Sequence, residues 1–287
     1  MHKRKFTTRL VEKQQTTIVK GPWGQSPPHG SDRKEVTAVR KTAKTLTITM
    51  LTAVICLSGY NLWRISDQYT KEERVKGEMT KYRPAALTVA AAAEPAKEFI
   101  AAMPEPMVNQ QIIDMQTEVN SDIVGWLTIP DTRIDYPFVI AEDNNYYLRR
   151  DLYKKQAPAG TLFMDYRCGK SFQDFNTIIY GHNMKNGSMF GDLKLFADEW
   201  FFAANTWATI SLWNNTYTAE IFAYMIVRAD DKIIFGLTAE KGEYLDYIKK
   251  NARHYREPDT EKKILTMATC SYEFNGARII LLANINS

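Results

Sequence analysis

The stretch ILTMATCSYEFNGARIILLANI, residues 264–285, holds two apolar runs on either side of a short polar segment. Runs of this length, rich in Ile, Leu and Thr and bounded by turn residues, are typical of β-strands. Cys270 stands where the first run ends. A free cysteine is most often a small buried side chain, so the alternative to weigh is a nucleophile held out at the end of a strand.

Similar short runs recur upstream of this stretch, separated by turn residues. They lie at 125–129, 134–139, 160–164, 177–180, 207–213 and 217–227, and the last two are 263–270 and 278–285. Eight short strands favour a β-barrel or a β-sandwich. Helical spacing of apolar residues predicts one helix at 108–119, before the first strand, and another at 238–250, between the sixth and the seventh.

The composition is that of an ordinary globular chain, with 45% hydrophobic and 24% charged residues over 287 positions. Residues 1–44 carry eleven Lys or Arg against three Asp or Glu, so the net charge of +4 leaves the remainder slightly acidic. No basic groove for nucleic acid is therefore implied. The three cysteines are far apart and lack metal-ligand spacing, so we expect no metal site.

An uncharged run, TLTITMLTAVICLSGYNLW, occupies residues 45–63. At about 1.5 Å per residue it would cross most of a hydrocarbon core of roughly 30 Å. Tyr60 and Trp63 fit an aromatic belt at the interface. Because Thr, Ser and Asn dilute the run, a buried core helix is one alternative, and a cleaved signal peptide is another.

The sequence therefore divides into four parts. We interpret 1–44 as a basic cytoplasmic tail, 45–63 as a transmembrane helix, 64–106 as an extracytoplasmic Ala/Pro-rich stalk and 107–287 as a compact domain. The leading arm is too short to be more than a tail, whereas the large folded part follows the span. This predicts a single-pass protein of the cell membrane with its N-terminus in the cytoplasm.

His182 follows the apolar run 177–180 directly, within NTIIYGHNM. Catalytic groups are often carried where a rigid element ends, although a surface histidine that caps a loop is the alternative. A cysteine acts as a nucleophile through its thiolate, which a nearby cation favours. Two cations are available to Cys270, a protonated His182 and Arg278, and Arg278 could equally be a solvated charge at the start of its strand.

The turn between the last two strands decides whether Cys270 and Arg278 can meet. In a strict two-residue hairpin Arg278 would lie opposite Glu273, on the other face from Cys270. An irregular loop over 271–277 would let the two share a face. A Glu273–Arg278 surface pair and a site built from Cys270 and Arg278 both remain open from spacing alone.

These segments resemble the class B sortases, cysteine transpeptidases of Gram-positive cell surfaces. The family's TLxTC signature is similar to TMATC, residues 266–270, with Met267 in place of Leu, a swap that conserves volume. Further similar segments follow in family order and cover most of 122–285. They are GWLTIPDTRIDYPFVIAEDNNYYLRRDL, AGTLFMDYRC and NTIIYGHNMKNGSMFGDL.

The resemblance implies a mainly β fold: an eight-stranded sortase-type β-barrel with N-terminal helices and one long helix between the sixth and seventh strands. It also implies a catalytic trio of His182, Cys270 and Arg278 in one cleft, which favours the irregular loop. The Cys270 thiolate would attack the carbonyl after a Thr and form a thioester. His182 would act as general acid and then base, and Arg278 would stabilise the oxyanion or hold the substrate backbone.

The resemblance further implies the reaction and its partners. The substrates would be surface proteins with a C-terminal sorting signal similar to Asn-Pro-Gln-Thr-Asn, and the acceptor an amine of peptidoglycan or its precursor. Exchange of amide for amide needs no ATP, metal or organic cofactor. Thr269, Ser271, Tyr272 and Glu273 are candidates for substrate binding, with loop packing and a solvated charge as the alternatives for the last two. No nucleic acid is expected, and membrane lipid would contact the N-terminal helix.

Three rival functions remain. A class B sortase could polymerise pilins instead of anchoring proteins to the wall. A cell-wall cysteine hydrolase would use the same nucleophile with water as acceptor, although papain-like enzymes place Cys on a helix ahead of His, and here His182 precedes Cys270. A non-catalytic, membrane-tethered binding module would have kept the barrel alone, and loss of a trio residue would have been its sign.

Overall fold

The computed structural model describes residues 30–84 and 108–286, with side chains described from residue 36 onward. Parts of the predicted tail, at 1–29, and of the predicted stalk, at 85–107, lie outside these residues. The chain divides into two compact units, of which the first ends at Leu62 and the second begins at Trp63. The barrel lies in the second unit.

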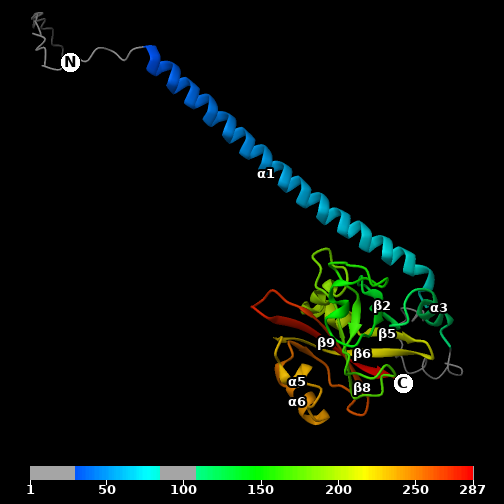
Figure 1. Cartoon of the computed structure of the whole chain (residues 1–287). Coiled ribbons are helices and arrows are strands. Elements are labelled where there is room, and N and C mark those ends of the chain that lie inside the picture. The colour runs from blue at the N-terminus through cyan, green and yellow to red at the C-terminus, as the bar shows by residue number, and fades with distance from the viewer. Residues whose placement is uncertain (1–29, 85–107, 287) are drawn as a thin grey trace, which may run out of the picture. The chain divides into compact units, whose positions relative to one another are not determined.

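Helix α1, Gly30–Met79, is the long helix of Figure 1. Among the described residues it is the one helix long and apolar enough to cross a membrane. Between Leu46 and Trp63 the helix exposes a run of large apolar side chains, a pattern that suits lipid rather than water. The hydroxyls of Thr45, Thr47 and Thr49 each donate to a carbonyl four residues earlier, so these polar groups are satisfied within the helix.

The end of α1 packs within the second unit. Met79 and Tyr82, the latter in the 3-10 turn Thr80–Tyr82, are buried beside Ile112 and Met115 of helix α3, Gln110–Glu118. The Tyr82 hydroxyl also donates a hydrogen bond to the Glu118 carboxylate. Residues 64–84, expected in a stalk, are therefore largely helical and contribute to the core.

Eight strands close into a barrel in the order β5-β1-β2-β3-β4-β8-β9-β6, with β6 pairing back to β5. The pairs β2–β3 and β4–β8 are parallel and the others antiparallel. This confirms the predicted eight-stranded barrel, to which the two-residue β7 is added beside β6. The strands are β1 Ile123–Thr128, β2 Asp135–Val139, β3 Leu162–Met164, β4 Asn176–Tyr180, β5 Trp207–Leu212, β6 Asn215–Arg228, β7 His254–Tyr255, β8 Lys263–Cys270 and β9 Ala277–Asn286.

Alternation along β8 separates an inner face from an outer one. Leu265 and Met267 belong to the core inside the barrel, whereas Ile264 and Ala268 belong to a second cluster outside it. Helices α5, Lys232–Phe235, and α6, Lys241–Asn251, complete that outer cluster and lie together at one side of the barrel in Figure 1. Helix α6 confirms the predicted helix between the sixth and seventh strands.

Several shorter helices connect the strands. They are the 3-10 segments Tyr146–Arg149 and Gly191–Ala197 and the α-helix α4, Glu199–Ala204. In α4 the side chain of Asp198 caps the first turn by accepting a hydrogen bond from the Phe201 N–H. The segment Tyr146–Arg149 borders the site described next through Leu148.

Candidate active site

Cys270 and Arg278 lie directly opposite each other on the antiparallel strands β8 and β9. Side chains of directly opposed residues project from the same face of a sheet. The intervening loop is irregular: the Ser271 N–H donates to the Ala277 carbonyl at 2.9 Å, and the Ala277 N–H donates to the Phe274 carbonyl at 3.1 Å. The strict two-residue hairpin is therefore wrong, and the irregular loop brings the thiol and the guanidinium together.

Glu273 does not pair with Arg278. Its carboxylate instead accepts two hydrogen bonds from the guanidinium of Arg253, one of them at 2.9 Å. The alternative of a Glu273–Arg278 surface pair is therefore wrong. Arg278 keeps its guanidinium beside the start of its own strand, where it donates to the carbonyl of Ala277 at 3.0 Å.

The accessibility of Cys270 follows from its place at the strand end. It shares the outer face of β8 with Ile264 and Ala268, which are covered, but it lies at the last position and is only half-buried. Cys168, by contrast, is buried, and burial raises the pKa of its thiol to about 11. Both thiols are free, so Cys270 is the one that the barrel leaves open to a reaction partner.

His182 is positioned by β4, which runs parallel to β8 with Tyr180 aligned to Ala268. The ladder continues past the strand, because the Gly181 N–H donates to the Ala268 carbonyl at 3.1 Å. The Nε2 atom of His182 lies 2.7 Å from the carbonyl oxygen of Leu148. Since a carbonyl can only accept, Nε2 carries the hydrogen, which leaves Nδ1 of the neutral ring to take up a proton.

Two side-chain hydrogen bonds tie the histidine segment to the cysteine strand. The Thr269 hydroxyl donates to the Gly181 carbonyl at 2.7 Å, and the Asn183 amide donates to the Cys270 carbonyl at 2.7 Å. Thr269 is buried, so its bond is partly shielded from water. The backbone around the thiol is thereby fixed relative to the backbone around the imidazole.

The three predicted catalytic residues, His182, Cys270 and Arg278, all line one pocket of about 270 Å³. Of the four substrate-binding candidates, Thr269 lines the same pocket, but Ser271, Tyr272 and Glu273 do not. Tyr272 is 77% exposed on the loop after the cysteine. The remaining lining residues are Asn144, Leu148, Phe163, Tyr180, Gly181, Ala229, Phe235 and Ala268.

One wall of this pocket is polar and was not predicted from the sequence. Asn144 and Tyr180 both donate to the carboxylate of buried Asp165, at 3.0 and 2.9 Å, and Arg167 binds the same carboxylate with two guanidinium nitrogens. Burial alone would raise the pKa of Asp165, but these hydrogen bonds outweigh it and lower the pKa below its usual range. No short motif links the three segments, so only their packing reveals the cluster.

Comparison with known proteins agrees with this architecture. The family model of the sortase domain matches residues 127–286. Sortase B of Listeria monocytogenes is 40% identical over 171 residues, which cover 58% of this chain and 69% of that protein. The solved structure of Clostridium perfringens sortase B has a TM-score of 0.57 and 31% identity, and the match covers 61% of this chain and 99% of that one.

A third similar protein is Spy0129, a Streptococcus pyogenes class B sortase involved in pilus biogenesis. Its structure has a TM-score of 0.57 and 31% identity, covering 61% of this chain and 97% of that one. The chain described here therefore belongs to the sortase family of cysteine transpeptidases. Within that family it falls in class B, the class of the relatives just named.

Proposed function

We propose that this transpeptidase is anchored in the cell membrane by α1, with its N-terminus in the cytoplasm and its barrel outside. It cleaves surface proteins after the Thr of a C-terminal sorting signal similar to Asn-Pro-Gln-Thr-Asn and transfers the acyl group to an amine of peptidoglycan or its precursor. One observation carries the proposal: Cys270 and Arg278 face each other across β8 and β9 and share a pocket with His182.

In the first half-reaction the Cys270 thiolate attacks the carbonyl carbon of the Thr. Negative charge develops on the carbonyl oxygen, and the guanidinium of Arg278, on the same face as the thiol, donates hydrogen bonds to it. His182 gives a proton to the leaving amine. Because its Nε2–H is engaged by the Leu148 carbonyl, Nδ1 is the nitrogen that carries this proton. The carbon–nitrogen bond breaks, and a thioester to Cys270 remains.

In the second half-reaction the acceptor amine attacks the thioester carbon. His182, now neutral, takes the proton that the amine releases, the carbon–sulfur bond breaks, and the Cys270 thiolate is regenerated. One amide bond replaces another, so the free energy of the original bond is conserved in the thioester. The reaction therefore needs no ATP, metal or organic cofactor.

The loop candidates retain distinct roles in this proposal. Thr269 lines the pocket, and its hydroxyl already donates to the Gly181 carbonyl, so it shapes the pocket instead of donating to the substrate. The other three candidates, Ser271, Tyr272 and Glu273, lie on the loop outside the pocket. They can therefore contact only those residues of the sorting signal that remain outside the pocket. The exposed ring of Tyr272 offers apolar surface for that contact.

Polymerisation of pilins is the second candidate function. It is favoured by the similarity to the Streptococcus pyogenes class B sortase, which is involved in pilus biogenesis. The acylation half-reaction would be identical, and a lysine side chain of a pilin would replace the amine of the wall precursor. Only the acceptor distinguishes the two functions.

The test uses the full chain in detergent micelles with a peptide that contains Asn-Pro-Gln-Thr-Asn. We expect intact-protein mass spectrometry to detect an acyl adduct on the wild type and on the matched control Cys168→Ala, but not on Cys270→Ala. Addition of an amine should remove the adduct and yield an amide. Release of the free acid alone, with amine present, would indicate a hydrolase, and absence of any adduct on a reduced Cys270 would overturn the proposed substrate class.

A further inference from the structure

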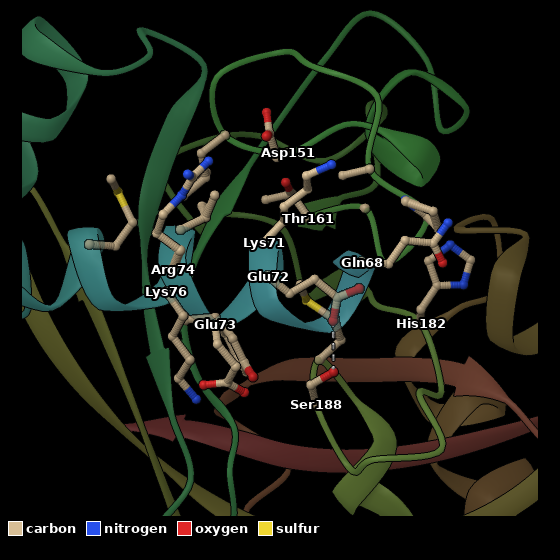
Figure 2. A pocket seen from close by; sticks show the side chains of 18 of the residues that line it. Gln68, Lys71, Glu72, Glu73, Arg74, Lys76, Asp151, Thr161, His182 and Ser188 are labelled. Atoms are coloured by element: carbon tan, nitrogen blue, oxygen red, sulfur yellow. Dashed lines mark hydrogen bonds between the residues drawn. The ribbon is translucent and has the colours of Figure 1, made fainter. Parts of the chain in front are cut away.

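A larger cavity, of about 930 Å³, lies beside the candidate active site. One wall is the part of α1 that belongs to the second unit, and the other walls come from β2, from the loop around 149–162 and from Ser188 (Figure 2). Among the described residues, His182 alone lines both this cavity and the pocket of Cys270. A ligand here can therefore reach the imidazole without passing through the pocket that holds the thiol.

Glu72 projects from α1 into this cavity with unused hydrogen-bonding capacity. Its Oε1 is buried and has no hydrogen-bond partner within the described chain, and its Oε2 accepts only a long bond of 3.5 Å from the Ser188 hydroxyl. Burial raises the pKa of this carboxyl to about 7. A buried carboxylate without a cation is unfavourable, so a cationic ligand would stabilise it.

Two other acidic side chains of the same helix, Asp67 and Glu78, already have cations. Asp67 pairs with Lys71 at 2.6 Å, and Glu78 lies 3.8 Å from Arg74. Glu72 takes part in none of the ion pairs formed by the described residues. The fold therefore leaves Glu72, with the adjacent Glu73, outside the ion pairs that neutralise Asp67 and Glu78. Of these two, Glu72 is the one with a buried carboxylate oxygen that has no hydrogen-bond partner.

The loop wall of the cavity carries two basic side chains beside the acidic Asp151. Arg149 and Lys155 both line it, and neither belongs to an ion pair of the described residues. A ligand that fits both walls carries an ammonium group for Glu72 and a carboxylate for the loop. Gln68, one helical turn before Glu72, extends toward the His182 end of the cavity in Figure 2 and offers an amide along the way.

We infer that this cavity is the acceptor site: it binds a peptide that bears a primary amine and a carboxylate, with the ammonium held by Glu72 before the amine attacks the thioester. The inference rests on the proposed function. The bound ammonium gives one proton to the Glu72 carboxylate and becomes a neutral amine. That amine forms the new carbon–nitrogen bond, its second proton passes to His182, and the carbon–sulfur bond to Cys270 breaks.

The test measures how the acyl-enzyme partitions between amine and water. The full chain in detergent micelles is acylated with the sorting-signal peptide at pH 8, where the Glu72 carboxyl is largely ionised, and is then offered triglycine or triglycinamide. We expect Glu72→Gln to raise the concentration of either acceptor that gives half-maximal amide product about tenfold, the order expected when one charge-assisted hydrogen bond is lost.

A second variant and a matched control complete the design. Arg149→Gln should raise the half-maximal concentration several-fold for triglycine but not for triglycinamide, which lacks the carboxylate. Glu78→Gln, outside the cavity and able to keep its bond from the Tyr153 hydroxyl, should behave as the wild type with both acceptors.

If the wild type forms no adduct, the proposed function and this inference fall together. If the adduct forms and Glu72→Gln partitions like the wild type, the acceptor site is overturned and the proposed function stands.

Discussion

The hydroxyl of Thr269 donates a hydrogen bond of 2.7 Å to the carbonyl oxygen of Gly181, so the residue before Cys270 is bonded to the residue before His182. Thr269 is the next-to-last residue of β8 and Gly181 directly follows β4, and the ladder of these two parallel strands already aligns them. The hydrogen bond from the Thr269 side chain restrains the backbone at the point where the hydrogen bonds between the two strands end. The relative position of thiol and imidazole therefore depends on this hydroxyl together with the bond from the Asn183 amide to the Cys270 carbonyl.

Thr269→Val should loosen this link while it keeps the shape of the side chain. The Gly181 carbonyl loses its donor, so we expect the free energy of unfolding to fall by about 1–2 kcal/mol. The acylation rate should fall roughly tenfold, because misplacement of catalytic groups is costly. Urea unfolding and single-turnover acylation measure the two effects. Thr117→Val, which removes an exposed hydroxyl bonded within α3, is the control, and equal losses in both variants would contradict the role of the link.

Gly181→Ala should disturb the same region by steric overlap. A Cβ at this position would overlap the side chains of Leu162 and Phe190, both buried in the core. Overpacking of this kind costs about 1–3 kcal/mol of stability, and it would displace His182, so acylation should slow as well. Gly242→Ala is the opposite case, since a Cβ there meets nothing within 4 Å on helix α6 and Ala favours helix. Thermal unfolding should rank the first variant below the wild type and the second at or above it; the reverse order would refute the packing argument.

The strands could be predicted from the sequence because a buried or half-buried strand appears there as a run of apolar residues between turn residues. All eight barrel strands were predicted in this way within a few residues of their observed bounds. Strand β7 was missed because a two-residue strand, His254–Tyr255, carries no periodicity. The closure of the barrel and its two parallel pairs depend on contacts between distant segments, which no local pattern encodes.

The residues of the candidate site could be predicted where they stand alone at the end or start of a strand, as His182, Cys270 and Arg278 do. Spacing alone left the partner of Arg278 open, and the hydrogen bonds inside the loop after Cys270 decided it. Residues 64–84 were predicted as the first part of an Ala/Pro-rich stalk. The burial of Met79 and Tyr82 could not be predicted, because it arises from contact with α3, a separate segment of the sequence. Asp165 was missed for the same reason, since its partners come from separate segments.

Arg278→Lys should separate charge from geometry at the proposed oxyanion site. Lysine keeps the positive charge opposite Cys270 but lacks the planar fork of donors. We expect the acylation rate to fall about 100-fold, the order seen when one oxyanion donor is lost, and Arg278→Gln to be slower still. Arg228→Gln, at an exposed arginine paired with Asp230, is the control. A lysine variant that acylates at the wild-type rate would show that Arg278 acts only as a charge.

The two thiols of the barrel should differ sharply toward an alkylating reagent. Cys270 lines an open pocket, whereas Cys168 is buried and burial raises its pKa to about 11, so little thiolate is present there at neutral pH. Iodoacetamide at pH 7.5 should therefore modify Cys270 in the folded chain, and Cys168 only after unfolding in urea. Peptide mapping by mass spectrometry measures both. Comparable modification of the two in the folded chain would mean that Cys270 has no privileged access.

Asp165→Asn should change both the stability and its dependence on pH. Hydrogen bonds lower the pKa of this carboxyl in the folded state, so its contribution is fully present above the unfolded value, near 3.8, and is lost as the pH falls through the lower folded value. At pH 7 the variant should be less stable by about 2 kcal/mol, since Arg167 loses its charged partner. The difference between the two proteins should shrink as the pH falls from 5 toward 2, because the wild type loses the same interaction by protonation.

Urea unfolding across this pH range measures the difference in stability. The control is Asp230→Asn, in an exposed pair with Arg228, which should change the stability little at any pH. Parallel stability curves for wild type and Asp165→Asn would mean that the carboxylate does not hold the polar wall of the pocket through its charge.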